Sequence, residues 1–123
     1  MGVMKALLDT NILIDYLNGA EVARTEIDRY KQALISPITW MEVMAGVTAD
    51  DESAVRQFLA GFQTVAINDN IAERAVCIRR LQRIRLPDAI IWASAQSENA
   101  LLVTRNSKDF PADDPGVRVP YRL

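Results

Sequence analysis

Short apolar segments separated by longer amphipathic ones are the feature that most restricts how this chain can fold. A strand exposed on one face alternates apolar and polar residues, whereas these segments are apolar nearly throughout, which is typical of strands covered on both faces. They occupy residues 4–8, 33–37, 64–67 and 101–104, with a weaker one at 116–120. Helices between successive strands fit parallel connections. The pattern predicts an α/β fold, a three-layer α/β/α sandwich with a short, mainly parallel central sheet.

Helical patterns fill the segments between the predicted strands, and their ends carry recognisable signals. Pro37 suits the first turn of the third helix, Gly46 suits its C-terminal cap, and Asn68 or Asp69 suits the start of the fifth. The predicted helices cover residues 11–19, 21–32, 38–46, 50–62, 68–84 and 86–100. The 123 residues contain no linker, repeat or low-complexity segment, so we expect residues 1–123 to form one domain.

Several apolar side chains are expected to face the interior. The spacing of the second helix points Val22, Ile27 and Tyr30 inward. Trp92 is expected in the core, and Cys77 is expected to behave as a small buried hydrophobic residue. A single cysteine cannot form an internal disulfide, so a reducing cytoplasm fits best. No apolar run approaches the about 20 residues of a membrane span.

The absence of histidine narrows the chemistry that is open to the chain. Without histidine there is no histidine general base, no Ser-His-Asp triad and no histidine metal ligand. One cysteine and no histidine also exclude the usual structural zinc sites. Chemistry in this protein must therefore rest mainly on carboxylates, with a metal that prefers oxygen ligands.

Four acids occupy positions near the expected carboxyl edge of the sheet, where open parallel sheets bind ligands. Asp9 directly follows the first strand, and Asp109 follows the fourth after a short loop. Glu42 lies near the start of a helix that leaves the second strand. Asp88 also opens a helix, but that helix precedes the fourth strand, so topology alone places it less securely.

Each acid also has a purely structural interpretation, and single residues do not decide between the two. Asp9 could cap the next helix, and Thr39-x-x-Glu42 matches a capping box. Asp88 suits a helix dipole, and Asp109 suits a turn. Four converging carboxylates would repel one another, however, and Mg²⁺ or Mn²⁺ would relieve that repulsion with oxygen ligands and bound water. Such a cation activates water and stabilises charge on phosphate.

Four motifs in series resemble those of PIN-domain proteins. They are "LLDTNILIDYL", the Glu of "SPITWMEVMAG", "LPDAIIWASA" and "LLVTRNSKDF", and together they extend over about residues 5–110. The likeness is greatest to small VapC-type toxins of prokaryotic toxin–antitoxin pairs. It implies a PIN-like fold and a metal-dependent endoribonuclease that hydrolyses RNA phosphodiester bonds with Mg²⁺ or Mn²⁺.

The resemblance also implies roles for individual residues. The family's four acidic positions correspond to Asp9, Glu42, Asp88 and Asp109, of which Asp9 and Asp88 would be the firmest metal contributors. Glu42 would bind metal or orient the attacking water. Asp109 is less securely assigned, because Asn106 lies close by and could bind metal-bound water or hold Asp109. Polar residues expected to support these acids by hydrogen bonds are Thr10, Asn11, Thr104 and Asn106.

Partners follow from the same resemblance. Proteins of this type usually form homodimers and are silenced by a small antitoxin, which often lays a helix along an apolar groove. The segment "ILIDYL" could line such a groove or pack against the sheet. An arginine cluster could contact RNA phosphates or form an ordinary solvated helix face. It comprises Arg79, Arg80, Arg83 and Arg85.

Other functions also fit parts of the pattern. A phosphorelay receiver domain is an α/β protein that uses Mg²⁺, but it needs adjacent acids after its first strand and a Lys-Pro pair, which this chain lacks. A PIN fold that binds RNA or protein without cutting would be marked by a missing acid, and none is missing. The sequence leaves open a nuclease of the same fold that acts on DNA, and it does not identify the RNA target.

Overall fold

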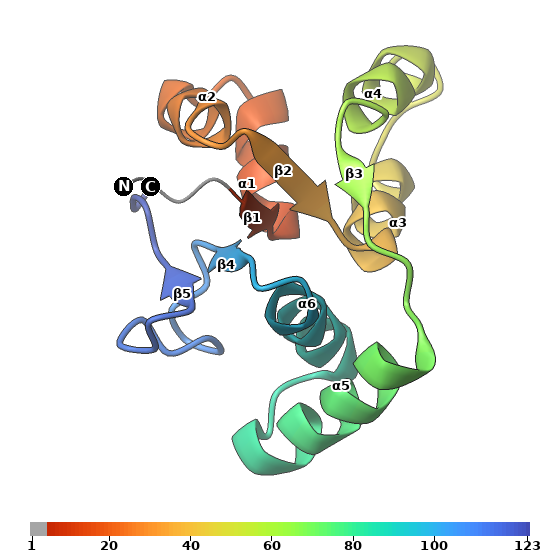
Figure 1. The fold of residues 1–123 in the computed structure, drawn as a ribbon. Helices are drawn as coiled ribbons and strands as arrows, with labels where there is room; N and C mark the ends of the chain where they lie inside the picture. Colours follow the sequence, from red (N-terminus) through yellow and green to blue (C-terminus); the bar gives the residue numbers. More distant parts are fainter. Residues whose placement is uncertain (1–4) are drawn as a thin grey trace.

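The centre of the protein is a five-stranded sheet in which every strand is parallel to its neighbours (Figure 1). The structure is a computed structural model that describes residues 5–123. The strand order is β3-β2-β1-β4-β5, so the first strand lies in the middle. The strands are β1 Lys5–Leu8, β2 Gln32–Ile35, β3 Gln63–Thr64, β4 Leu101–Val103 and β5 Val117–Arg118. The predicted parallel sheet is confirmed, although Met4, the predicted start of the first strand, lies outside the described residues.

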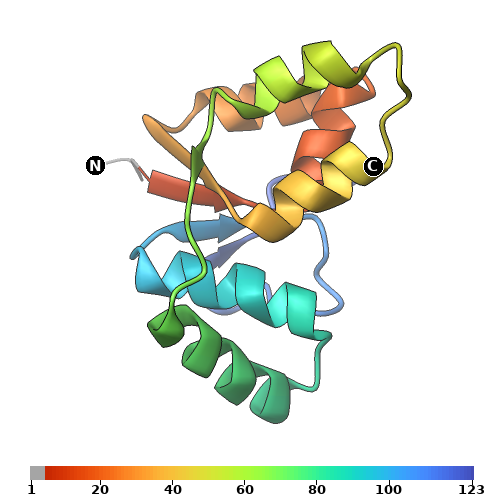
Figure 2. The same cartoon turned by 90° about the vertical axis from the view of Figure 1, so that its right-hand side faces the viewer.

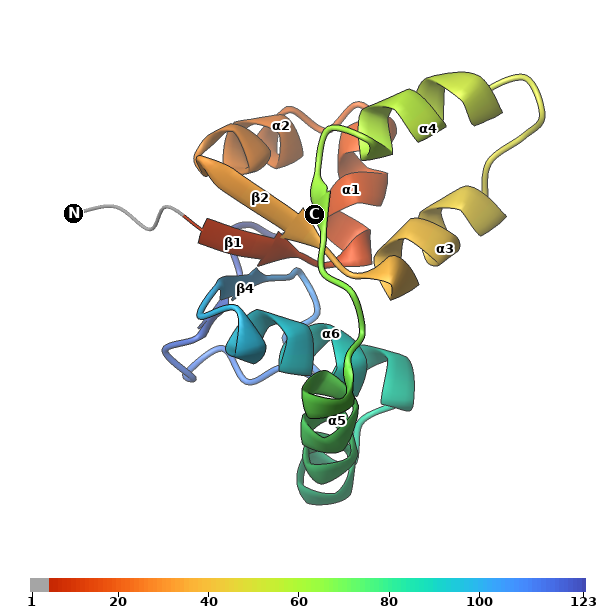
Figure 3. The same ribbon diagram turned by 45° about the vertical axis from the view of Figure 1, so that its right-hand side comes forward.

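Within residues 5–123, six helices cover the two faces of the sheet, as the sequence predicted. In Figure 3, α5 and α6 lie on one face, and α1, α2, α3 and α4 lie on the other. Figure 2 shows the same division, with α5 and α6 in green to cyan beneath the sheet. The helices are α1 Thr10–Leu17, α2 Glu21–Asp28, α3 Pro37–Ala45, α4 Glu52–Leu59, α5 Asp69–Gln82 and α6 Leu86–Ser97. In the described part of the chain, none is long and apolar enough to cross a membrane.

Alternate residues of β1 enter two separate hydrophobic clusters, because successive side chains of a strand point to opposite faces. Leu7 packs in the cluster that α5 and α6 supply, which also contains Trp92 and Phe110 with their rings edge to face. Ala6 and Leu8 pack in the cluster on the α1 side. All three β1 residues are fully buried. The central strand is therefore fixed from both faces, and so is the position at which it ends.

Some core predictions were wrong in ways that the packing explains. Val22 is 45% exposed, whereas Ile27 and Tyr30 pack against the core as expected. The side of α2 that turns inward also buries Glu26, whose carboxylate receives hydrogen bonds from Arg118 and Tyr30. Cys77 is exposed, because α5 packs on α6 through another of its faces.

The start of α3 differs from the expected capping box in a way that matters for the site. Ser36 caps the helix by accepting a hydrogen bond from the backbone N–H of Ile38, and Pro37 occupies the first turn as predicted. Thr39 and Glu42 therefore lie inside the helix and do not form the box that their spacing suggested. Glu42 therefore does not cap the helix, and it lies in the second half of α3.

The helix ends at Gly46 and Asn68 agree with the sequence. Gly46 is the C-cap of α3, and the Asn68 side chain caps α5 by accepting a hydrogen bond from Ile71 N at 2.8 Å. The third strand is shorter than predicted and begins earlier, at Gln63. Val65, which follows it, is nonetheless buried in the core.

Candidate functional site

The carboxyl ends of the strands form one edge of the sheet, and the four predicted acids lie on segments that begin there. Asp9 directly follows β1, and the loop that carries Asp109 follows β4. Glu42 is on α3, which begins after β2. Asp88 reaches the same edge because α6 runs back along the sheet to the start of β4, so its first turn lies at the opposite end. The topology thus supplies the placement of Asp88 that the sequence left open.

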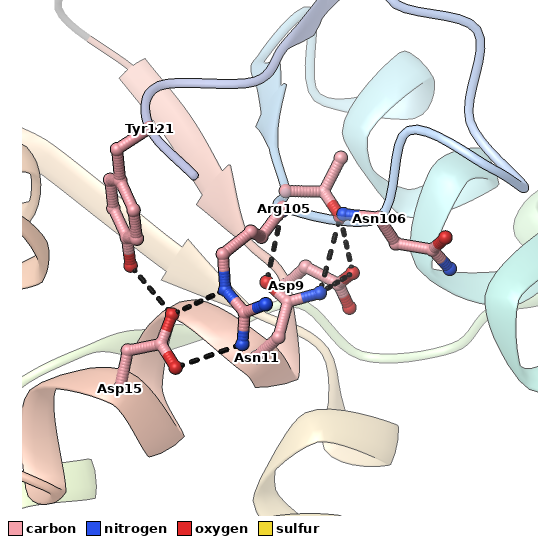
Figure 4. A network of polar contacts seen from close by, with 7 residues as sticks. Asp9, Asn11, Asp15, Arg105, Asn106 and Tyr121 are labelled. Atoms are coloured by element: carbon pink, nitrogen blue, oxygen red, sulfur yellow. Dashed lines mark hydrogen bonds and ion pairs between the residues drawn. The ribbon is translucent and has the colours of Figure 1, made fainter. Parts of the chain in front are cut away.

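Asp9 is a buried carboxylate held by several donors (Figure 4). Its Oδ1 accepts from the backbone N–H of Thr10 at 2.8 Å, which makes it the N-cap of α1. Its Oδ2 accepts from the Thr104 hydroxyl at 2.7 Å and from Asn11 Nδ2 at 3.1 Å. Burial raises the pKa of Asp9 to about 6, against the lowering effect of the Thr104 and Thr10 bonds. The capping and chemical interpretations of Asp9 are therefore compatible.

The negative charges of Asp88 and Glu42 also raise the pKa of Asp9. Burial raises the pKa of Asp88, the positive charge of Arg85 lowers it, and the charges of Asp109 and Glu42 raise it further. The four acids therefore act on one another through these linked interactions. Two of them, Asp9 and Asp88, are buried, so water screens their charges poorly.

Glu42 is connected to Asp9 through the residue next to it in the chain. The Thr10 hydroxyl donates to Glu42 Oε1 at 2.6 Å, and the hydroxyls of Thr10 and Thr39 lie 3.0 Å apart. Thr39 is fully buried, so this contact fixes α3 against the start of α1. Thr10 contacts Glu42 through its side chain and Asp9 through its backbone.

Asp109 and Asn106 form a paired turn after β4. Asn106 Nδ2 donates to Asp109 Oδ2 at 3.0 Å, and the Asp109 backbone N–H donates back to Asn106 Oδ1 at 3.2 Å. The Asn106 backbone N–H donates to the Thr104 hydroxyl at 3.0 Å, which in turn contacts Asp9. Asn106 therefore holds Asp109, one of the two roles that the sequence left open for it.

A second polar network, which the sequence did not predict, lies beside the contacts of Asp9 (Figure 4). The Arg105 guanidinium donates two hydrogen bonds to the buried Asp15 of α1, at 2.7 and 3.0 Å, and the Tyr121 hydroxyl adds a third at 2.9 Å. The Arg105 backbone N–H donates to Asn11 Oδ1 at 3.1 Å. Asn11 thus links Asp9 to the network of Asp15, Arg105 and Tyr121.

The donor set fits Mg²⁺ or Mn²⁺ by chemical type. Between residues 5 and 123, no three aspartate, glutamate or cysteine side chains form a group that could hold a metal ion as they are placed. These cations keep several waters and bind proteins through one or two carboxylates, so a set of three is not required. The raised pKa of Asp9 reflects a charge that its surroundings only partly compensate, and a bound cation would complete that compensation.

The arginine cluster divides into two parts. Arg79 and Arg80 lie in the last turn of α5, and Arg83 is its C-cap in a left-handed backbone conformation, with φ at 56°. All three side chains are exposed. Arg85 lies just before α6 and forms an ion pair with Asp88, with Nε 3.4 Å from Oδ2. One member of the predicted RNA-binding cluster therefore contacts a predicted catalytic acid.

The segment "ILIDYL" is also divided. Ile12 and Leu13 are fully buried in the core, whereas Ile14 and Leu17 line a groove of about 560 Å³ between α1, α3 and α4. Glu42 lines the same groove, so one of the site acids faces it. The two expectations for this segment, a groove and core packing, each apply to part of it.

The chain is similar to several known proteins. A family model described as "PIN domain" matches residues 6–112. The chain is 29% identical over 113 residues to Ribonuclease VapC10 of Mycobacterium tuberculosis, with 85% of each covered. It is similar to a toxin-antitoxin complex from Klebsiella pneumoniae, with a TM-score of 0.91 and 46% identity over 96% of this chain and 99% of that one. DNA-bound VapBC from Salmonella typhimurium gives a TM-score of 0.76 and 26% identity, over 94% and 96%.

Proposed function

This chain belongs to the PIN-domain family, and from that premise we propose that it is a metal-dependent endoribonuclease, the toxin of a type II toxin–antitoxin pair. Its substrate is RNA, whose phosphodiester bonds it hydrolyses with Mg²⁺ or Mn²⁺. Residues 1–123 act as one nuclease domain, and the protein works in the cytoplasm. The phosphorelay receiver considered above is set aside, because that function belongs to a different family.

The observation that carries this proposal is the set of linked carboxylates at the carboxyl edge of the sheet. Asp9 and Asp88 are buried, and the charge of Asp88 raises the pKa of Asp9. A fold gains nothing in stability from two buried acids that repel each other. Perturbed acids gathered at a sheet edge are typical of a functional site. The ribonuclease name of the Mycobacterium tuberculosis relative supports the same activity for this chain.

The surroundings of each of the four acids suggest its role in RNA hydrolysis. Asp9 and Asp88 would hold the cation, since their burial keeps the carboxylates in place. Glu42 is exposed and accepts one hydrogen bond from Thr10, so it is free to orient the attacking water. Asp109 is held by Asn106 and would complete the site from the loop after β4. When bound, the divalent cation lowers the pKa of water and stabilises negative charge on the phosphate.

The partners follow from the 46%-identical neighbour, which is described as a toxin–antitoxin complex. We propose that this chain likewise binds a small antitoxin, and that it forms a homodimer, as the resemblance to VapC-type toxins implies. The groove lined by Ile14 and Leu17 is its candidate docking site, and Glu42 at its edge lies within reach of a basic antitoxin side chain.

The test is cleavage by the purified protein. With Mg²⁺ or Mn²⁺ it is expected to cut a mixture of cellular RNAs, and EDTA is expected to stop it. Asp9→Asn is expected to abolish cleavage while the circular dichroism spectrum stays native, and Asp113→Asn, which changes an exposed loop acid, is expected to cut like the wild type. Equal cutting by Asp9→Asn would refute the proposed site. RNA binding without cleavage would favour a non-catalytic module, and preferential cutting of DNA would change the substrate class.

A further inference from the structure

Arg85 is a cation of the chain itself that contacts one of the four site acids. It precedes the first residue of α6, and its Nε lies 3.4 Å from Asp88 Oδ2. The Arg85 side chain is 76% exposed, whereas the Asp88 side chain is only 10% exposed. An exposed, solvated arginine thus contacts a buried carboxylate, and the arginine is the partner with open solvent into which it can turn.

The contact is weaker than the other arginine–aspartate pair of the site region. Arg105 binds Asp15 through two hydrogen bonds at 2.7 and 3.0 Å, and its side chain is 34% exposed. Two-point pairing of this kind fixes an arginine in one geometry. Arg85 makes one long contact from a largely solvated position, where ion pairs add little to stability. Asp15 therefore holds the Arg105 side chain in place, whereas the Arg85 side chain can leave Asp88.

We propose that Arg85 is an exchangeable counter-ion: it neutralises Asp88 while the acidic site holds no cation, and it turns to a phosphate of the RNA backbone once a divalent cation binds. This inference rests on the proposed function, because it needs both a cation and RNA at the site. It assigns Arg85 two successive partners, an internal carboxylate and an external phosphate.

Burial of Asp88 is the reason that this carboxylate needs a counter-ion. A buried carboxylate needs a nearby positive charge, and Arg85 supplies one at a geometry that a divalent cation could displace. Because one Asp88 oxygen faces Arg85, the two cations compete for the same carboxylate. The ion pair with Arg85 holds Asp88 in position before metal binds, at the expense of a modest loss in metal affinity.

The position of Arg85 in the chain places it close to three other arginines. Only residues 83–85 separate the end of α5 from the start of α6. Arg85 is therefore two residues from the exposed Arg83 and close in sequence to Arg79 and Arg80 in the last turn of α5. A guanidinium released from Asp88 joins this basic segment beside the acids, where an RNA strand brings a row of phosphates. Arginine suits this role because its planar group pairs with carboxylate and phosphate alike.

The test measures metal affinity and substrate affinity separately. Mn²⁺ binding to the metal-free protein is followed by isothermal titration calorimetry, without RNA. Arg85→Gln is expected to bind Mn²⁺ about two- to five-fold more tightly than the wild type, which is the range for an exposed ion pair. Arg85→Lys keeps the charge and is expected to stay close to the wild type. Arg56→Gln is the matched control, since it breaks an exposed arginine–glutamate pair on α4.

RNA cleavage at saturating Mn²⁺ gives the second measurement. Arg85→Gln is expected to raise KM for RNA several-fold with little change in kcat, because Arg85 would then contact phosphate and not the reacting atoms. Equal or weaker Mn²⁺ binding by Arg85→Gln would overturn the inference, as would equal tightening by Arg56→Gln or an unchanged KM. A wild-type protein that binds no Mn²⁺ would refute the proposed function itself, whereas a wild type that binds Mn²⁺ and cuts RNA isolates the outcome to Arg85.

Discussion

Replacing Asp9 by asparagine is expected to stabilise the metal-free protein at neutral pH, although it removes a residue of the proposed active site. Asp9 is 5% exposed, and burial raises its pKa from 3.8 to about 6. The folded state therefore holds the ionised carboxylate less favourably than the unfolded chain does. Asparagine has nearly the same shape and carries no charge, so this unfavourable contribution disappears in the variant.

The size of the effect follows from the pKa shift. At about 1.4 kcal/mol per pKa unit, a rise from 3.8 to about 6 corresponds to about 3 kcal/mol. Below pH 3.8 the carboxyl is protonated in both states and nothing is lost; the loss grows as the pH rises through this window and is complete above about 6. The amide cannot accept every hydrogen bond that Asp9 accepts, and one lost bond costs about 1 kcal/mol. The expected net gain at pH 7.5 is therefore about 1–3 kcal/mol.

Urea unfolding in EDTA at pH 3.5 and pH 7.5 measures this difference by circular dichroism. The free energy of unfolding of Asp9→Asn relative to wild type is expected to rise between the two pH values by about 3 kcal/mol. Titration of acids that do not interact with Asp9 occurs in both proteins and cancels in the comparison, whereas Asp88 and Glu42, whose charges act on Asp9, contribute to the measured difference. Asp113→Asn, at an exposed position, is expected to show no such rise.

An equal stability difference between Asp9→Asn and wild type at both pH values would show that burial of the Asp9 carboxylate does not destabilise the folded protein. Added Mg²⁺ gives an independent check. A ligand that binds only the folded state stabilises it, so wild type is expected to gain stability in Mg²⁺ and the asparagine variant to gain less. A gain of the same size in both proteins would remove Asp9 from the metal site.

Two further predictions concern residues outside the acidic set. Tyr121→Phe removes one of the three hydrogen bonds to the buried Asp15 and is expected to lower the free energy of unfolding by about 1–2 kcal/mol in urea; an unchanged midpoint would show that this contact contributes nothing. Changing Arg79, Arg80 and Arg83 to glutamine is expected to weaken RNA binding and flatten its dependence on salt, since each lost phosphate contact reduces the slope by about 1. An unchanged slope would return these arginines to the solvated-face interpretation.

The parts of the fold that the sequence predicted are those determined by local pattern. The buried β1 and the apolar α6 are specified by runs of neighbouring residues, and Pro37 and Asn68 mark helix starts by their own conformational preferences. The capping box at Thr39 and Glu42 was wrong because Ser36 and Pro37 offered a competing start three residues earlier. Local signals determine the kind of element well, and competition between them decides its first residue.

The network of Asp15, Arg105 and Tyr121, which the sequence did not predict, depends on residues that lie far apart in the chain. Asp15 lies 90 residues from Arg105 and 106 from Tyr121. No spacing rule links side chains across such distances, since the pairing exists only after β1 and β4 have come together. Cys77 was misplaced for a related reason: its exposure depends on which face of α5 meets α6, and a helix with apolar residues on several sides does not specify that face.

The same long separations govern when the acidic site can exist during synthesis. Asp9 is made early, but the hydroxyl that binds its Oδ2 belongs to Thr104, 95 residues later. A nascent chain that ends at Ala100 carries Asp9, Glu42 and Asp88 but lacks β4, which would lie beside β1. On the proposed function, the nuclease site is therefore incomplete until β4 and Thr104 have been synthesised.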